Sequence, residues 1–355
     1  MVQSNLCTQF AHEIGRIRPL DDEAMRMTDV RLGNLTKPPG SLGKLEDIAR
    51  QLAGITGEVD PDLSRKAIIV MAADHGVCAE GISAFPADVT PQMVMNFLSG
   101  GAAVNVLAKQ AGADVVCVDI GVNAELEHPD LYARKLMHGT NNMAQGRAME
   151  HDTAVQALLT GIELVETLWN KGYRLFATGE MGIGNTTASA AVMSVLTGCS
   201  PEEAAGRGTG IDDARLAHKI EVIRRSIAIN EPNVEDPFDV LGKIGGLEIA
   251  GLAGVILGAA ARRCPVVIDG FISSAAALIA ARMAPDAVQY MIGSHLSNEQ
   301  AHKKLLDAIG LAPVIHLDMR LGEGTGAALC FHLIEAAQRL LREMATFDSA
   351  GVSRG

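Results

Sequence analysis

The first residue whose surroundings suggest chemistry is Glu323, a single carboxylate between two glycines in the stretch LGEGTGAAL (321–329). The preceding run PVIHLD (313–318) predicts a strand and the following apolar run predicts a helix, so Glu323 is expected beside a helix N-terminus. A helix dipole favours the carboxylate by about 0.3–1 kcal/mol, whereas burial beside an apolar ligand raises the pKa of the group. The spacing supports two interpretations equally. Glu323 is a general base, or it only favours the helix dipole while Thr325 caps the helix.

A second candidate is the glycine-rich stretch TGEMGIGNTTASAA (178–191), which follows a predicted strand and opens a predicted helix. Gly182 and Gly184 expose the backbone, and Asn185 and Thr186 add polar side chains. Unpaired N–H groups at a helix start favour phosphate. No lysine follows the glycines and the spacing is not G-x-G-x-x-G, so the pattern does not favour nucleoside triphosphates or dinucleotides. Phosphate binding and a plain capped turn are equally supported.

A third candidate is the long segment ADHGVCAEGISAFPADVTPQ (73–92). Its Asp-His pair has no second histidine at ligand spacing, so we expect no metal site. Ser83, Phe85 and Gln92 suit the wall of a pocket for a flat apolar ligand with one or two polar contacts. An ordered surface loop fits the same composition.

Lys219, near the start of a predicted amphipathic helix, is the fourth candidate. A lone helical lysine is usually solvated. It becomes a partner for phosphate or carboxylate only if its helix face meets the glycine loops.

Six short runs, most of them continuously apolar, predict strands that are covered on both faces, with helical stretches between them. They are residues 67–73, 114–121, 174–180, 265–270, 290–294 and 313–318. This alternation predicts an α/β protein with a doubly wound, mostly parallel, six-stranded sheet. Ligands bind such sheets at the carboxyl ends of the strands, where the candidate residues lie.

Both chain ends read as helical, so we predict a small helical domain from residues 1–60 plus 328–355 and an α/β catalytic domain from residues 61–327. Two helix starts are also predicted, at Pro91 after Thr90 and at Pro201 after Ser200, where Glu203 completes a capping box.

The composition narrows the classes of function. The net charge of −12 without a strongly basic stretch and the 3% aromatic content argue against nucleic-acid binding. The six cysteines are widely spaced, which favours reduced thiols in a cytoplasmic protein. The longest uncharged apolar run, residues 249–261, is too short for a membrane span, which needs about 20 residues, so we expect a buried helix there.

Seven stretches together resemble one known family and span nearly the whole chain. They are TKPPGSLGKLE (36–46), ADHGV (73–77), ISAFP (82–86), GTNNMA (139–144), GEMGIGNTT (179–187), IDGFISSAAA (268–277) and RLGEGTGAAL (320–329). In these stretches the sequence resembles the nicotinate-nucleotide–dimethylbenzimidazole phosphoribosyltransferases of the lower-ligand pathway of cobalamin.

The resemblance implies transfer of the phosphoribosyl group of nicotinate mononucleotide to 5,6-dimethylbenzimidazole with inversion at C1′, giving α-ribazole 5′-phosphate and nicotinate. It implies that Glu323 is the general base for the benzimidazole N–H, that Glu180 lies near the ribose and the leaving base, and that Lys219 is close to it. It further implies a homodimer with a Rossmann-like sheet domain and a small helical domain from both chain ends. Because the donor carries only one phosphate, we expect no metal, and we expect no cofactor.

Strand-end position and the resemblance together suggest the remaining contacts. We assign the phosphate to the loop from Gly182 to Thr186 with Gly293 and Ser294, and the benzimidazole pocket to Ser83, Phe85 and Gln92.

Three other functions are weaker. A nucleotide-dependent oxidoreductase needs G-x-G-x-x-G after the first strand, where MAADHGVCAEG stands instead. A non-enzymatic nucleotide-binding or scaffold protein would leave Glu323 dispensable. A diphosphate-dependent phosphoribosyltransferase would be expected to carry paired acids at a strand end to manage magnesium diphosphate, and VCVDIG has one acid only.

Overall fold

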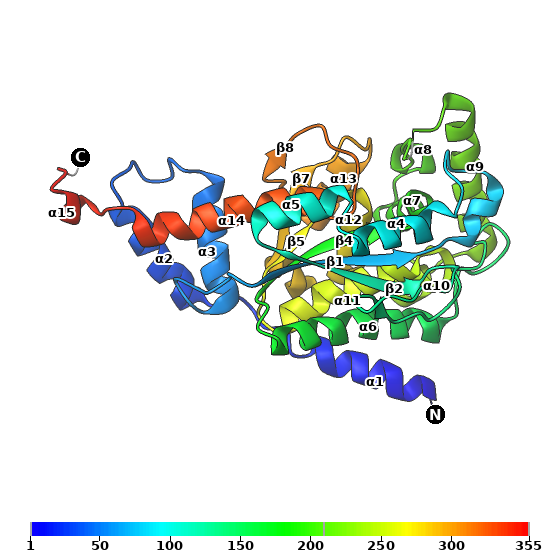
Figure 1. The fold of residues 1–355 in the computed structure, drawn as a ribbon, viewed down its shortest axis with the longest axis horizontal. Helices are drawn as coiled ribbons and strands as arrows, with labels where there is room; N and C mark the ends of the chain where they lie inside the picture. Colours follow the sequence, from blue (N-terminus) through cyan, green and yellow to red (C-terminus); the bar gives the residue numbers. More distant parts are fainter. Residues whose placement is uncertain (1, 209, 354–355) are drawn as a thin grey trace.

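A computed structural model describes residues 2–208 and 210–353 of the chain as an α/β protein built on a parallel sheet (Figure 1). The strand order is β3-β2-β1-β4-β5-β6, and each neighbouring pair is parallel. The strands are β1 (Lys66–Ala73), β2 (Asp114–Gly121), β3 (Tyr132–Ala133), β4 (Leu175–Met181), β5 (Val266–Ile268) and β6 (Met291–Gly293). The predicted doubly wound, Rossmann-like architecture is confirmed.

The sixth strand of this sheet is not the one the sequence predicted. The run at 313–318 contributes β8 (Ile315–His316), which pairs with β7 (His295–Leu296) in a separate two-stranded sheet. The strand that the sequence did not predict is β3, which pairs with β2 at the sheet edge through only two residues. A strand of two residues has no periodicity to detect, because alternation needs at least four positions to show.

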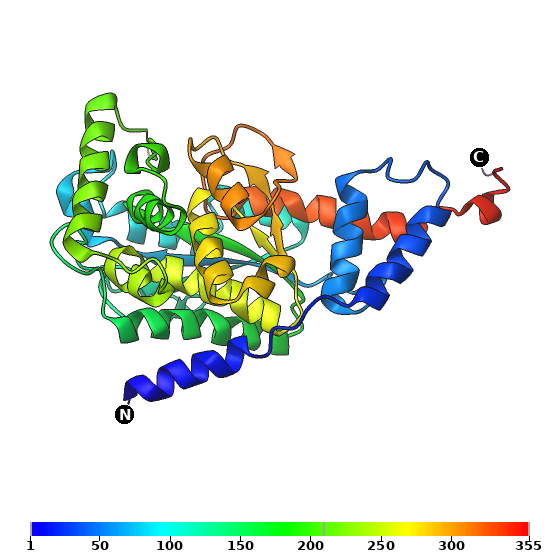
Figure 2. The same cartoon turned by 180° about the vertical axis from the view of Figure 1, so that it is seen from behind.

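Helices cover both faces of the sheet (Figures 1 and 2). On one face lie α4 (Val89–Leu98), α5 (Ala103–Ala111) and the first part of α14 (Thr325–Glu343). On the other lie α6 (His151–Asn170) and α11 (Leu247–Ala261). All eight residues of β1 are buried, which explains its continuously apolar sequence.

Helix α11 is the apolar run that the sequence placed in the core, and all but its last residue are buried. Its glycines let it cross α6 closely, since a Cβ at Gly254 would meet the backbone of Leu158. The described residues contain no helix long and apolar enough to cross a membrane.

The other helices connect these layers or extend them. They are α1 (Val2–Ile14), α2 (Asp22–Asn34), α3 (Lys44–Thr56), α7 (Asn185–Thr197), α8 (Pro201–Ala204), α9 (Asp213–Asn230), α10 (Pro237–Ile244), α12 (Phe271–Met283), α13 (His302–Ile309) and α15 (Phe347–Ala350), with 3-10 turns η1 (Gly76–Glu80) and η2 (Pro285–Tyr290).

The two predicted helix starts differ in outcome. The capping box at α8 is confirmed, because Ser200 Oγ accepts from the Glu203 N–H at 3.3 Å and Glu203 Oε2 accepts from the Ser200 N–H at 3.0 Å. Helix α4 instead begins at Val89, before Thr90. The Thr90 hydroxyl accepts from the Ile183 N–H at 3.1 Å, so this side chain supports the glycine loop after β4.

Helices α2, α3 and the second half of α14 form an arm beside the sheet domain (Figure 2). An isolated bridge between Leu35 and Thr346 ties the two chain ends together there. Helix α1 lies against α6 and α11 instead. The division into residues 1–60 plus 328–355 and residues 61–327 stays a proposal, and its second boundary falls within α14.

Candidate active site

A cavity of about 470 Å³ opens at the carboxyl ends of the strands. It lies at the point where the order of strands in the sheet reverses. The chain runs from β1 to β2 and β3 on one side of β1, and β4, β5 and β6 then follow on its other side. Its lining comes from the ends of β4 and β5, from the segment around α4 and from the loop before α14. The lining residues are Phe85, Val89, Met93, Glu180, Met181, Gly182, Ile183, Asn185, Thr186, Gly208, Gly270, Phe271, Ile272, Ser297, Glu299, Arg320, Leu321, Gly322 and Glu323.

Glu323 is one of these lining residues. Its φ of 63° is in the left-handed region, which few residues other than glycine adopt. Its N–H donates to Glu180 Oε1 at 3.3 Å, which ties the loop to β4. The glycines on either side are required by packing, because a Cβ at Gly322 would collide with Glu180 Oε1 and one at Gly324 would lie 2.6 Å from Ile68. The loop therefore presents the Glu323 carboxylate to the cavity, while Gly322 and Gly324 pack against residues of β4 and β1.

The Glu323 carboxyl is suited to accept a proton. Its side chain is nearly buried, with 8% of the residue exposed, and Oε2 has no hydrogen-bond partner within the described chain. Burial raises the pKa of Glu323 to about 7, and the nearby charge of Asp269 acts in the same direction. A carboxyl with this pKa is partly ionised at neutral pH and holds a proton well once it receives one.

Glu180 lies beside it at the end of β4 and is also buried. Burial raises the pKa of Glu180 to about 8, against the hydrogen bond from the Glu323 N–H, which lowers it. The Asn185 side-chain amide donates to the other oxygen, Oε2. Glu180 thus connects the Glu323 loop to the start of α7.

The residue that caps α14 is Asp269, at the end of β5, and not Thr325. Asp269 Oδ2 accepts from the Gly324 N–H at 3.0 Å and Oδ1 accepts from the Ala327 N–H at 3.0 Å. Thr325 Oγ1 donates to the Gly322 carbonyl at 2.8 Å instead. The interpretation of Thr325 as the cap is therefore wrong, because a buried aspartate directly after β5 already satisfies these N–H groups.

The glycine loop after β4 leads into α7, whose first turn has no side-chain cap. Gly184 is the N-cap residue with a φ of 94°, and a Cβ there would lie 2.6 Å from Cys78 Sγ. Gly182, Asn185 and Thr186 line the cavity. The loop thus combines close packing against η1 with a helix start that faces the cavity.

Lys219 contacts this loop. Contact between its helix and the glycine loops was the requirement for the predicted binding role. Its Nζ donates to Thr186 Oγ1 at 2.8 Å and to the Gly206 carbonyl at 3.1 Å. Burial lowers the pKa of Lys219 to about 8. Ser83 and Lys219 both line a small hollow of about 30 Å³ beside the loop.

The other predicted contacts divide into two groups. Phe85 lines the large cavity and is 53% exposed. Gln92 is exposed on α4 and is not part of the lining. Gly293 and Ser294 also lie outside it, and the Ser294 hydroxyl is buried, donating to the Asp269 carbonyl at 3.2 Å.

Sequence reasoning missed several lining residues. Met181, Phe271 and Ile272 supply apolar wall, and Arg320 and Glu299 supply charge near the mouth. Arg320 directly precedes the Glu323 loop and Phe271 begins the helix that follows the β5 strand end, so strand-end position was the available signal.

The Asp-His pair after β1 is used inside the protein. His75 Nε2 lies 2.7 Å from Glu248 Oε1, and both residues are buried. Burial alone would lower the pKa of His75, but the Glu248 carboxylate outweighs it and the pKa is raised. No group of three or more His, Cys, Asp or Glu side chains is arranged to hold a metal ion in the described ranges.

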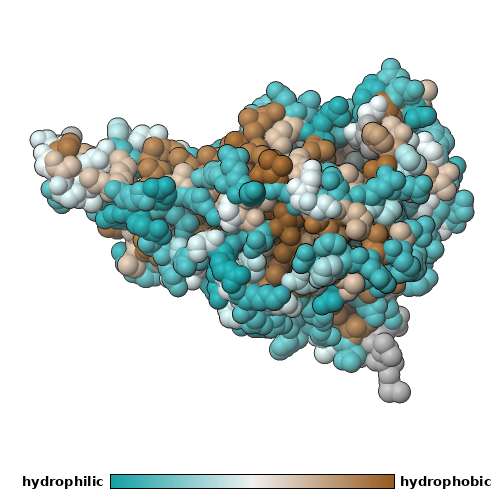
Figure 3. All heavy atoms as spheres, in the orientation of Figure 1, coloured by the Kyte–Doolittle hydropathy of each residue, from teal (hydrophilic) through white to brown (hydrophobic). Residues whose placement is uncertain are grey.

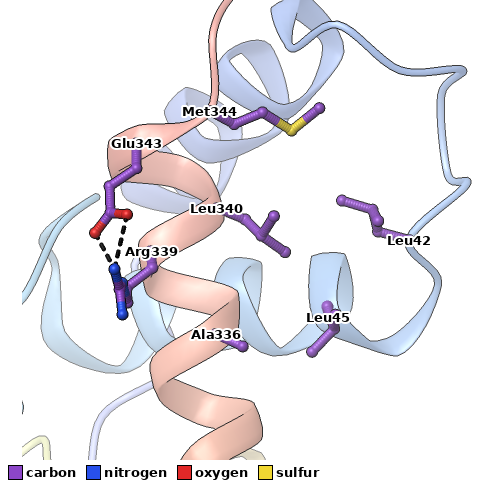
Figure 4. A pocket seen from close by; sticks show the side chains of 7 residues that line it. All are labelled: Leu42, Leu45, Ala336, Arg339, Leu340, Glu343 and Met344. Atoms are coloured by element: carbon purple, nitrogen blue, oxygen red, sulfur yellow. Dashed lines mark hydrogen bonds and ion pairs between the residues drawn. The ribbon is translucent and has the colours of Figure 1, made fainter.

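A second hollow lies on the arm, between the start of α3 and the end of α14 (Figure 4). Leu42, Leu45, Leu340 and Met344 line it, and Arg339 pairs with Glu343 at 2.8 Å on its rim. Apolar side chains are exposed on this arm (Figure 3). The hollow offers apolar contact and no reactive group.

Comparison with known proteins agrees with this geometry. A family profile described as "Phosphoribosyltransferase" matches residues 17–352. Nicotinate-nucleotide–dimethylbenzimidazole phosphoribosyltransferases are 58% identical over 350 residues in Chloroflexus aggregans (98% of both chains) and 52% identical over 349 residues in Geobacter sulfurreducens (98% of this chain and 99% of the relative). The crystal structure of the enzyme so named from Thermus thermophilus superposes with a TM-score of 0.89 at 46% identity, covering 95% of this chain and 100% of that one.

The parallel sheet, the cavity at its switch point and the matched profile define a phosphoribosyltransferase. The identity along nearly the full length specifies the group further. The chain belongs to the nicotinate-nucleotide–dimethylbenzimidazole phosphoribosyltransferase family, as the sequence motifs predicted.

Proposed function

We propose that the cavity at the strand ends transfers the phosphoribosyl group of nicotinate mononucleotide to 5,6-dimethylbenzimidazole, with Glu323 as the general base. The observation that carries the proposal is the Glu323 carboxyl, which lines the cavity with an unpartnered Oε2 and a pKa raised to about 7 by burial. The substrates are those named for the similar enzymes.

The acceptor needs a base in this position. One benzimidazole nitrogen bonds to C1′ through its lone pair, and the product would remain a cation unless the other nitrogen lost its proton. Glu323 takes that proton as the bond forms. The C1′–nicotinate bond breaks with its electron pair moving to the ring nitrogen, which is cationic in the donor and neutral after departure, so no general acid is required.

Attack from the face opposite nicotinate inverts C1′, which converts the β-linked donor into α-ribazole 5′-phosphate. Phe85, Met181 and Phe271 supply apolar surface for a flat base. The loop with Gly182, Asn185 and Thr186 at the uncapped start of α7 binds the phosphate, supported by Lys219 through Thr186. Glu180 holds the Glu323 backbone from the ribose side of the cavity.

The first test replaces Glu323 by glutamine, which keeps the shape of the side chain and removes its basicity. Purified Glu323→Gln should bind both substrates and lose turnover by about 10²–10⁴-fold. Nicotinate release and the anomer of the product are the readouts. Glu335→Gln, on the helix that follows and outside the cavity, serves as control. Near-normal turnover by Glu323→Gln would refute the base assignment.

The phosphate assignment has its own test. Nicotinate riboside lacks only the phosphate, so it should bind much more weakly than nicotinate mononucleotide in a calorimetric titration. Equal binding of the two would remove the phosphate from the loop after β4.

We also propose that the enzyme is a cytoplasmic homodimer. The apolar hollow on the arm supports this, since a second copy would cover Leu340 and Met344. Light scattering should give the mass of two chains, and Leu340→Glu should shift the mass toward one. A monomeric wild-type enzyme with full activity would refute the dimer.

A further inference from the structure

We propose that Asp269 is a positioning residue for the transfer reaction, because its carboxylate fixes the backbone that aims Glu323 into the cavity. The inference rests on the proposed role of Glu323 as base and adds a second residue on which that role depends.

The geometry around Asp269 is unusual for a helix cap. The residue that normally caps a helix directly precedes it, and here that residue is Gly324, which has no side chain to do so. Asp269 reaches α14 from the end of β5 and uses both oxygens, one for the Gly324 N–H and one for the Ala327 N–H, each at 3.0 Å. Both oxygens of Asp269 therefore accept backbone N–H groups at the α14 N-terminus, the task that a capping side chain performs.

Asp269 is itself held firmly. Its N–H donates to Thr178 Oγ1 at 3.2 Å, and its carbonyl accepts from Ser294 Oγ at 3.2 Å. The residue is 1% exposed. The carboxylate therefore has a fixed position relative to β4 and to the turn after β6. Its two hydrogen bonds hold the start of α14 at a fixed place relative to these elements.

Glu323 stands between two such anchors. Glu180 accepts from the Glu323 N–H on one side, and Asp269 accepts from the Gly324 N–H on the other. Its positive φ of 63° is a strained conformation for a residue other than glycine, and it persists only where the surroundings impose it. Without the bond to Gly324, the peptide that follows Glu323 is free to turn, and the carboxylate leaves its productive direction.

Asp269 also acts on Glu323 through its charge. After burial, the Asp269 charge is the cause that raises the pKa of Glu323. The charged or titratable groups around Glu323 come from several elements. Glu180 on β4 accepts from its N–H, Asp269 after β5 acts on its pKa, and Arg320 in its own loop lines the same cavity. His295 on β7 lies 3.9 Å from Asp269 Oδ1. Glu299 lines the same cavity, and Glu248 on α11 acts on Glu180. Of these, only Asp269 both bonds to the loop after Glu323 and raises the pKa of Glu323.

Two substitutions separate position from charge. Asp269→Asn keeps the shape but removes the charge and one acceptor. It should lower kcat by roughly tenfold to a hundredfold, with a smaller effect on KM, and move the acidic limb of the kcat–pH profile down by about one pH unit. Asp269→Glu keeps the charge and displaces the oxygens. It should lower kcat comparably and leave the acidic limb in place.

A structural control is available in the same chain. Asp236 caps α10 by accepting from Phe238 and Asp239 at 3.0 and 3.3 Å, away from the cavity. Asp236→Asn should lower the melting temperature without moving the limb. If Asp269→Asn does not give folded protein, as judged by circular dichroism, Asp269→Glu decides the question through its kcat alone.

The outcomes are distinct. An Asp269→Asn enzyme with kcat within twofold of wild type, or with the limb unmoved and only its melting temperature lowered as in Asp236→Asn, would overturn the inference. Full turnover by Glu323→Gln would instead refute the proposed base, and absence of nicotinate release by wild type would refute the proposed reaction.

Discussion

The candidate site contains titratable side chains that the fold holds out of water. Glu180 and Glu323 have raised pKa values because burial disfavours their charge, and Lys219 has a lowered one for the same reason. Glu180 and Glu323 line the large cavity and Lys219 lines the small hollow beside it. Perturbed pKa values gathered around a cavity are typical of functional sites. At the residue scale these three groups have pKa values within about one unit of pH 7 to 8, so each can change its charge near neutral pH.

Lys219 offers a test at this scale. Lys219→Met removes the donor to Thr186 and to the Gly206 carbonyl, which leaves the loop after β4 without its buried support. We expect affinity for nicotinate mononucleotide to fall by roughly tenfold and stability to fall by about 1–3 kcal/mol. Calorimetric titration and urea unfolding measure the two. Lys243→Met, in the last turn of α10 and outside both cavities, is the control. Unchanged affinity in Lys219→Met would exclude this support role.

The elements around the cavity show which parts of the site a sequence can reveal. Glu323 and the loop after β4 were predictable because each lies between a strand signal and a helix signal within about ten residues. The cap from Asp269 to Gly324 was not, because it joins residues 55 positions apart and Asp269 reads locally as an ordinary strand end. Likewise β8 had the right local pattern, and only the tertiary fold placed it beside β7 instead of in the main sheet.

Gly184 provides the element-scale prediction. Gly184→Ala puts a Cβ at a φ of 94° and within 2.6 Å of Cys78 Sγ, so both strain and collision oppose it. Gly198→Ala at the other end of α7 has a φ of 71° and meets nothing within 4 Å, so it carries the strain alone. We expect Gly184→Ala to lose more stability, by about 1–3 kcal/mol in total, and to weaken nicotinate mononucleotide binding. Equal stability and binding of the two variants would show that the contact with η1 is not important.

At the scale of the whole molecule, the sheet brings distant segments to one edge. Residues after β1, β4 and β5 and before α14 meet there because parallel strands place their carboxyl ends side by side. The same burial that prepares the site has a cost for the fold. A carboxyl whose pKa is raised on folding keeps a proton that the unfolded chain releases, so it destabilises the folded state once the pH exceeds its ordinary pKa.

This cost can be measured as a pH dependence. The pKa of Glu323 is about 7 in the folded chain against an ordinary value of 4.5, so its contribution to stability declines as pH rises from about 5 and is fully unfavourable above about 7. Glu323→Gln removes this dependence and should be more stable than wild type by roughly 3 kcal/mol at pH 8, but by only about 1 kcal/mol at pH 5. Urea unfolding of both proteins across this range gives the difference directly. Glu58→Gln, on the exposed surface, controls for the substitution itself. A wild-type-to-variant difference that stays constant from pH 5 to pH 8 would mean that Glu323 is ionised throughout, and the pH limb of the reaction would then belong to another group.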